Sequence, residues 1–101
     1  MKHMKVGASV VSCRRGGNTA SFDVLNKYFT ISSMPVVSST YWNQIHGFTA
    51  EDAKKDIEGL QTMRNIAKNM SFMIRAIENE KSKSGYPKLD LGAYTSFPDG
   101  K

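Results

Sequence analysis

A short run of arginines and glycines, Arg14-Arg15-Gly16-Gly17-Asn18, interrupts an apolar part of the chain just before a helical pattern. Arginines supply positive charge and paired N–H donors, and glycines let a ligand approach the backbone closely. The start of a helix would add amide donors for an anionic or planar ligand. The spacing matches neither a Walker loop nor a GxGxxG fingerprint. A solvated turn whose glycines only satisfy its geometry explains these residues at least as well.

A second stretch, from Tyr41 to Gly47, places two aromatic residues and an amide side by side as Tyr41-Trp42-Asn43. Aromatic side chains of this kind can stack against a planar ring in a ligand pocket. They can equally serve as anchors that hold a long loop against the body of the protein. From these residues alone we favour the anchors.

Two predicted strands and a helix would position these stretches. The run Lys5–Ser12 is short, apolar and not cleanly alternating, which is typical of a strand covered on both faces, and Gly7 would let a helix approach it closely. Val36–Ser39 reads as a second strand. Between them we predict a helix over about Thr19–Ser33. This crossover is long enough to return parallel, so both loops should follow the carboxyl ends of parallel strands, where ligands bind in α/β sheets.

The helix ends show local signals. Asn18 or Thr19 can cap the first helix, and Pro35 prevents its continuation. After a long loop from Tyr41 to about Ala53, a second helix begins either at a Thr49 capping box or nearer Asp56, and it ends near Ser82. Its apolar stripe consists of Ile57, Leu60, Met63, Ala67, Met70, Ile74 and Ile77. We therefore expect one partial α/β domain over residues 1–84 and an irregular tail over residues 85–101.

The composition restricts the possible partners. Fourteen Lys and Arg against nine Asp and Glu leave a net charge of +5, which favours an anionic partner such as a phosphate, a nucleotide or nucleic acid. The basic residues are scattered and no nucleic-acid motif is present, so a nucleic-acid binder that uses Arg14, Arg15 and Trp42 ranks last. No apolar run is long enough for a membrane span, and none is expected.

The remaining reactive side chains suggest no further chemistry. The single cysteine, Cys13, cannot form an internal disulfide, so a reducing, cytoplasmic setting is the default expectation. A small residue at a strand end explains it better than a redox thiol does. His3 and His46 lack metal-ligand spacing, so no metal site is predicted and His46 is expected in a loop. No catalytic acid, base or nucleophile is predicted.

Two strands are too few for an independent sheet. A strand pair needs further strands or packing to persist in water, and neither predicted strand carries the charges that protect an exposed edge. We therefore expect this chain to form a homo-oligomer, or to pair with a missing N-terminal half.

In its order of motifs the chain resembles the C-terminal half of the flavodoxin-like NAD(P)H-dependent FMN reductases, a broad family that includes iron–sulfur flavoproteins. The matching stretches are Lys5–Ser12, Arg14–Gly17, Ser39–Asn43 and Asp56–Arg64. The resemblance implies the C-terminal β-α-β-α half of a flavodoxin-like, doubly wound parallel sheet. No single stretch is specific, but together they span roughly Lys5 to Ile77 in the expected order.

The resemblance also implies a function. Hydride would pass from NAD(P)H to FMN and on to an acceptor such as a quinone, a nitro compound or a metal centre. Residues Arg14–Asn18 would border the isoalloxazine ring, and the stretch Tyr41-Trp42-Asn43 would lie nearby and reach across a dimer interface. The two loops with which the family also holds FMN, after its first and third strands, have no counterpart in these residues. The alternative is a non-catalytic fragment or interaction module that has lost cofactor binding.

Overall fold

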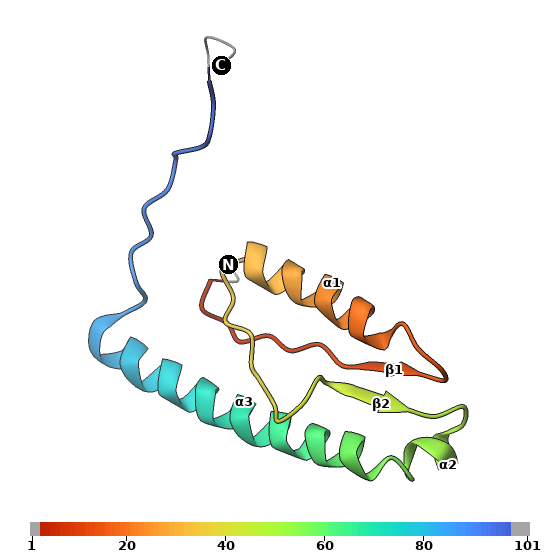
Figure 1. Ribbon diagram of the computed structural model, residues 1–101. Helices are drawn as coiled ribbons and strands as arrows, with labels where there is room; N and C mark the ends of the chain where they lie inside the picture. Colours follow the sequence, from red (N-terminus) through yellow and green to blue (C-terminus); the bar gives the residue numbers. More distant parts are fainter. Residues whose placement is uncertain (1–2, 98–101) are drawn as a thin grey trace.

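The structure is a mixed α/β arrangement of two parallel strands and three helices among the described residues. The computed structural model describes residues 3–97. Its elements are β1 (Val11–Cys13), α1 (Asn18–Ile31), β2 (Gln44–His46), α2 (Ala50–Ala53) and α3 (Ile57–Ser84). The strands lie between α1 and α3, and both run toward the edge at which α1 and α3 begin (Figure 1). The predicted parallel β-α-β crossover is therefore confirmed.

The two strands pair in two separate places. Val11–Cys13 align in register with Gln44–His46, and Gly7 forms an isolated parallel bridge with Val36. Between these places residues 8–10 lie opposite residues 37–43, so the second strand leaves the sheet and then returns to it. We call residues 37–43 the arch.

The arch makes the prediction of a second strand over Val36–Ser39 wrong. Within that run the pairing with the first strand is limited to the bridge between Gly7 and Val36, in which the Val37 amide donates to the Gly7 carbonyl at 3.0 Å. The loop predicted from Tyr41 to Ala53 instead contains β2 and α2. An apolar, β-branched run is a good strand former, but residues 38 and 39 bond to α3 and not to a neighbouring strand.

Close packing at Gly7 brings α1 onto the strands. A Cβ atom on Gly7 would lie 2.7 Å from the ring of Phe29, so any larger residue would displace the helix. This confirms the expected role of Gly7. Within the helix Phe22 and Phe29 are half-buried, while the other apolar residues Tyr28 and Ile31 are exposed.

The start of α1 differs from the prediction. Gly17 occupies the N-cap position with φ at 86°, a left-handed conformation that glycine adopts without strain, and no side chain caps the helix. The expected cap from Asn18 or Thr19 was therefore wrong. The helix ends at Ile31, two residues before the predicted Ser33.

Both predicted starts of the second helix are real, because each begins a separate helix. Thr49 and Asp52 form a reciprocal capping box at α2: the Thr49 hydroxyl accepts from the Asp52 amide at 3.2 Å, and the Asp52 carboxylate accepts from the Thr49 amide at 3.3 Å. Asp56 caps α3 by accepting from the Gly59 amide at 2.9 Å. α3 then continues to Ser84, two residues past the predicted end.

The apolar core is small. Among residues 3–97 only Val37 and Ile66 are buried apolar side chains. Ile66 was not in the predicted stripe of α3, whereas Ile57, its first member, is 77% exposed. The buried face of α3 is therefore rotated around the helix relative to the predicted apolar stripe.

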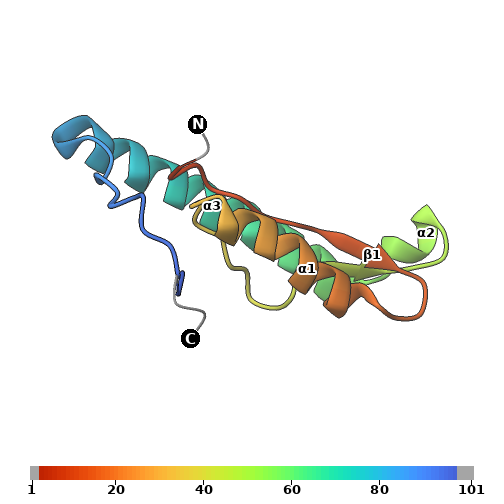
Figure 2. The same cartoon turned by 90° about the horizontal axis from the view of Figure 1, so that it is seen from above.

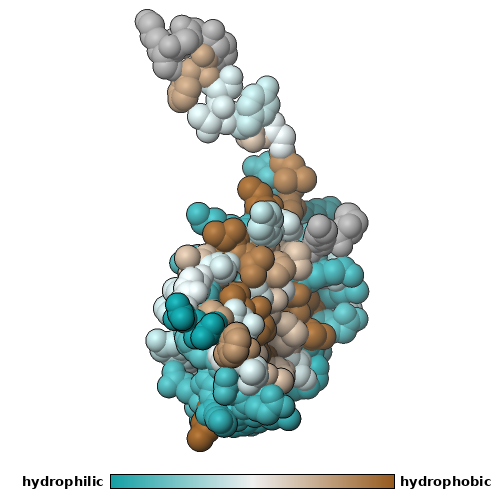
Figure 3. All heavy atoms as spheres, turned by 90° about the vertical axis from the view of Figure 1, so that its right-hand side faces the viewer, coloured by the Kyte–Doolittle hydropathy of each residue, from teal (hydrophilic) through white to brown (hydrophobic). Residues whose placement is uncertain are grey.

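Much of the chain's apolar surface is uncovered. Figure 2 shows that α3 runs on beyond α1 and the strands, and residues 85–97, which form no helix or strand, leave the body as an extended segment (Figure 1). Figure 3 shows hydrophobic side chains across the middle of the molecule between hydrophilic margins. Within the described part of the chain, no helix combines the length and the apolar character that crossing a membrane requires.

Candidate functional site

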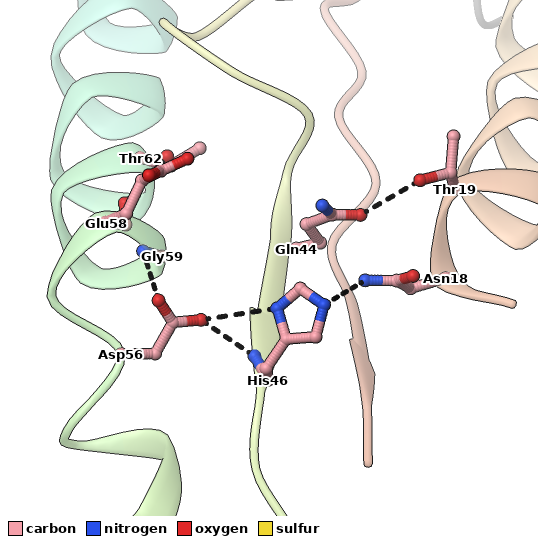
Figure 4. Close-up of polar contacts among 8 residues, drawn as sticks. All are labelled: Asn18, Thr19, Gln44, His46, Asp56, Glu58, Gly59 and Thr62. Carbon is pink, nitrogen blue, oxygen red and sulfur yellow. Dashed lines mark hydrogen bonds and ion pairs between the residues drawn. The ribbon is translucent and has the colours of Figure 1, made fainter. Parts of the chain in front are cut away.

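A histidine and an aspartate lie together at the edge where the strands end (Figure 4). His46 is the last residue of β2, and its backbone amide donates to Asp56 Oδ2 at 2.8 Å. Its ring Nδ1 lies 3.6 Å from the same oxygen. These contacts join the end of β2 to the start of α3, because Asp56 also caps that helix.

Asn18 lies on the other side of the histidine ring. Its Nδ2 is 3.2 Å from His46 Nε2, so the amide of Asn18 can donate to one ring nitrogen while the other, Nδ1, faces Asp56. Asn18 is 6% exposed, and this bond explains why its side chain does not cap α1. Beside it the Thr19 hydroxyl donates to Gln44 Oε1 at 3.3 Å. The network thus ties α1, β2 and α3 together.

The carboxylate of Asp56 is stabilised in its ionised form. The backbone amide of His46 lowers the pKa of Asp56 most, followed by the amide of Gly59, and the nearby His46 ring lowers it further. Partial burial opposes these effects. The network is therefore built for a charged aspartate, which suits a structural connection between helix and strand.

Sequence reasoning did not find this network. The expectation that His46 is a loop histidine is wrong, because it ends a strand. The one available signal was the predicted helix start near Asp56, and the structure shows that Asp56 caps α3. Nothing in the spacing of Asn18, His46 and Asp56 indicates that three elements bring them together.

The first predicted site segment, Arg14–Asn18, lies at the carboxyl end of β1, where its first four residues are exposed and Asn18 is buried. We call residues 14–17 the basic loop. The Arg14 guanidinium lies over the Phe48 ring, 4.2 Å from its centre, and Arg15 is exposed. A Cβ atom on Gly16 or Gly17 would meet nothing within 4 Å. Within residues 3–97 the amides of residues 18–20 donate no hydrogen bond, as is usual in the first turn of a helix.

The second predicted site segment lies in the arch, before β2 and not after a strand. Tyr41 and Trp42 are each about half exposed. Their rings contact each other, and the Trp42 ring also contacts Phe22 of α1, with the centres 6.0 Å apart. Asn43, in contrast, is 2% exposed. The aromatic pair thus anchors the arch to α1, as expected from the residues alone, and still presents ring surface to solvent.

Side-chain hydrogen bonds hold the arch in place. From one polar face of α3, Asn69 Nδ2 donates to the Ser38 carbonyl at 2.8 Å, and Asn65 Nδ2 donates to the Thr40 hydroxyl at 3.1 Å. At its end Asn43 Nδ2 donates to the Ser9 carbonyl at 3.0 Å and so replaces a strand-to-strand bond. The arch is therefore a defined part of the fold.

The two predicted segments flank α1 but do not meet. The basic loop precedes the helix, and Trp42 contacts it about one turn further along, at Phe22. Among the described residues no hydrogen bond, ion pair or ring contact joins the basic loop to Tyr41, Trp42 or Asn43. Cys13, as expected, is a half-buried residue at the end of β1.

These groups favour ligand binding over covalent chemistry. In the described part of the chain, no three His, Cys, Asp or Glu side chains lie close enough to hold a metal ion. The exposed donors are backbone amides and arginines, which suit an anionic or carbonyl-bearing ligand. When we compared the chain with protein-family models, with curated proteins and with solved structures, we found no match.

Proposed function

We propose that this chain is the C-terminal half of a flavodoxin-like, NAD(P)H-dependent FMN oxidoreductase and supplies one wall of its flavin site. The observation that carries the proposal is the uncapped start of α1, where free amides lie next to the exposed basic loop at the carboxyl end of a parallel strand. This is where α/β sheets bind nucleotides. The order of motifs along the chain is the second support.

The residues at this edge fit part of a flavin. The pyrimidine side of the isoalloxazine ring carries carbonyl and nitrogen acceptors, which the amides of residues 18–20 and the two arginines can serve. The open space around Gly16 and Gly17 leaves room for a flat ring. FMN, when bound, would take hydride from NAD(P)H and pass it to an acceptor such as a quinone, a nitro compound or a metal centre.

Within this proposal the chain positions the ring and supplies charge. Arg14 and Arg15 add positive charge at an edge that becomes more negative when the ring is reduced, which favours the reduced state. The network of Asn18, His46 and Asp56 holds the start of α1 against β2. The basic loop therefore has a fixed base while its tip stays exposed. Residues outside this chain would form the remaining walls.

The test is FMN binding by the full-length protein. We expect visible flavin absorbance that is lost, with affinity reduced roughly tenfold or more, when Arg14 and Arg15 are both replaced by alanine, because charge-assisted hydrogen bonds are removed. The matched control replaces Lys54 and Lys55, which removes the same charge from the exposed end of α2. Full-length protein that stays colourless and does not bind added FMN would rule the proposal out.

A specific observation also favours the alternative, an interaction module without cofactor. Large apolar side chains on the outer side of α1 and on the first strand are each at least 40% exposed; they include Val10, Val24, Leu25, Tyr28 and Ile31. Burying such a surface drives association. Sedimentation should show that the chain self-associates or binds the missing half. A stable monomer that unfolds cooperatively would contradict this expectation.

A further inference from the structure

The side of the first strand that faces away from β2 is an open edge. Toward the second strand the bonded groups are the Gly7 amide at 2.9 Å, the Ser9 carbonyl at 3.0 Å, the Val11 amide at 3.0 Å and the Cys13 carbonyl at 2.9 Å. Successive residues of a strand bond to opposite sides, so residues 8, 10 and 12 face away from β2. Among residues 3–97 the sheet has two strands, and Ala8 and Val10 form no backbone hydrogen bond. Because residues 6–12 contain neither proline nor a charged side chain, the sequence does not protect this edge against a further strand.

One face of the same strand is also uncovered. Its odd-numbered residues face α1, because Gly7 lies against Phe29 and the Ser9 hydroxyl donates to Asn26 Oδ1 at 2.8 Å. Its even-numbered residues therefore face the other side of the sheet. On that side α3, as described, packs against β2 and makes no contact with β1, and Val10 is 53% exposed. The open edge thus lies beside an open apolar face.

The segment after α3 has the pattern of a strand but no partner. We call residues 87–97 the arm. Its less polar side chains occupy alternate positions, the period of a strand with one apolar face: Leu89, Leu91, Ala93, Thr95 and Phe97. Leu91 is 81% exposed and Phe97 65%. Within residues 3–97 the arm forms no hydrogen bond, ion pair or ring contact. Gly92, with φ at 96°, is a bend that glycine can open without side-chain strain.

The arm extends away from the body of its own copy. It starts after Tyr86, whose ring contacts the His3 ring, with the centres 5.7 Å apart, and lies 5.2 Å from the Lys81 ammonium. From there it runs outward (Figure 1). The radius of gyration is 17.9 Å, whereas a compact domain of this length has about 13 Å. The arm therefore presents its apolar side chains to another molecule.

Charge argues against the simplest alternative, direct pairing of two such edges. Two copies of one edge pair around a two-fold axis as antiparallel strands. That arrangement brings Lys5 of each copy next to Arg14 of the other, and like charges that face each other destabilise a strand pair. The arm carries Lys88 and Asp90, whose charges cancel. It can therefore meet the edge without this repulsion.

We propose that the chain forms a dimer by exchange of arms, in which residues 87–97 of each copy add a strand to the open edge of residues 6–12 in the other copy. Backbone hydrogen bonds to residues 8, 10 and 12 hold the arm, and its apolar face covers Val10. Exchange in both directions closes the assembly at two copies. This assigns self-association to the strand edge and not to the outer side of α1, and it does not depend on FMN binding.

Sedimentation velocity over a range of protein concentrations tests the arm. We expect the full chain to be a dimer, and Leu91→Lys to raise its dissociation constant roughly tenfold or more, because a buried leucine is replaced by a charge. Ile31→Lys is the matched control: Ile31 is 86% exposed on α1, and its replacement should leave the dimer unchanged. A monomer at every concentration would overturn the proposal. So would a dimer that Leu91→Lys leaves intact, or one that Ile31→Lys weakens as much.

A matched pair of valines tests the edge. Val10 is 53% exposed on the first strand, and Val24 is 55% exposed on α1. Val10→Lys should weaken the dimer roughly tenfold or more, because a charge on an edge strand opposes pairing, whereas Val24→Lys should leave it unchanged. Equal effects would show that the arm does not bind this edge. Replacing Arg14 and Arg15 by alanine, which tests the flavin site, should leave the dimer intact, so the two proposals fail separately.

A synthetic peptide of residues 87–97 tests whether the arm binds as a strand. The receiver is the full-length Leu91→Lys variant, whose own arm is disabled, and the anisotropy of a fluorescent label on the peptide measures binding. Two further peptides carry N-methyl groups on the amides of residues 89, 91 and 93 or of residues 90, 92 and 94. Alternate amides of a strand face its neighbour, so one methylated peptide should lose binding and the other should keep it. If both bind or both fail, the arm does not pair as a strand and the proposal is wrong.

Discussion

The arch is tied to α3 and to the first strand by side-chain hydrogen bonds, whereas the basic loop contacts its surroundings through Arg14 on Phe48. Both segments carry residue types that bind ligands. The difference is that the arch is held by these hydrogen bonds along one side of a pocket that is open to solvent, while the basic loop is exposed. The arch is therefore the more firmly held of the two segments.

The largest expected loss of stability tests whether the side-chain hydrogen bond of Asn43 holds the arch in place. Asn43→Ala removes the bond to Ser9 and leaves a buried carbonyl unpaired, so it should lower the free energy of unfolding by about 2 kcal/mol. Chemical denaturation measures this. The matched exposed substitution Asn79→Ala, on α3, should stay within about 0.5 kcal/mol. Equal effects would mean that the arch is not fixed by Asn43.

The polar network of Asn18, His46 and Asp56 should contribute somewhat less to the free energy of unfolding than Asn43 does. Asp56→Ala removes the α3 cap and the acceptor for the His46 amide, so we expect a loss of about 1.5 kcal/mol at neutral pH. The folded-state pKa of Asp56 lies below its ordinary 3.8. The contribution is therefore complete above that pH and disappears as the pH falls through the folded-state value. A difference between variant and wild type that persists at lower pH would contradict the network.

The backbone conformation of the basic loop predicts a smaller loss of stability when one of its glycines is replaced. Gly17 has φ at 86°, so Gly17→Ala should cost about 1 kcal/mol of unfolding free energy. Gly16 is the control, because its φ is not positive and a Cβ there meets nothing within 4 Å. Thermal or chemical unfolding of both variants compares them. If the two cost the same, the left-handed start of α1 is not a constraint.

The smallest effect concerns the two arginines. Arg14→Ala removes the contact with Phe48 and should lower the unfolding free energy by about 0.5 kcal/mol, a typical value for an exposed cation–π pair. Arg15→Ala should leave stability unchanged within error, because among residues 3–97 its exposed side chain forms no hydrogen bond, ion pair or cation–π contact. A larger loss for Arg15 would show that the loop is more ordered than its contacts indicate.

Local patterns predicted much of the fold. The two long helices, the Thr49 capping box and the alternative helix start near Asp56 were read from the sequence because they depend on side chains a few residues apart. The parallel crossover followed from its length, and the need for glycine at position 7 from the apolar run around it. The errors were of another kind: the second strand over Val36–Ser39 and the cap of α1.

These errors share one physical cause. Val36–Ser39 looks like a strand, but Asn69 and Thr62 of α3 bond to its end and draw the chain into the arch. Asn18 looks like a helix cap, but His46 takes its side chain. In each case a hydrogen bond to a residue far along the sequence replaced the one that local preference indicated.

The sequence by itself determined which residue types are present for binding: a basic glycine loop, an aromatic pair and a following amide. Only the tertiary structure decided that they form two places and not one, since the basic loop precedes α1 while Trp42 of the arch contacts the helix at Phe22, about one turn further along. It also decided that Asn43 is buried with an unpaired oxygen. Burial and hydrogen-bond pairing depend on which distant segments of the chain come into contact. The amino-acid sequence determines those contacts only through the complete fold.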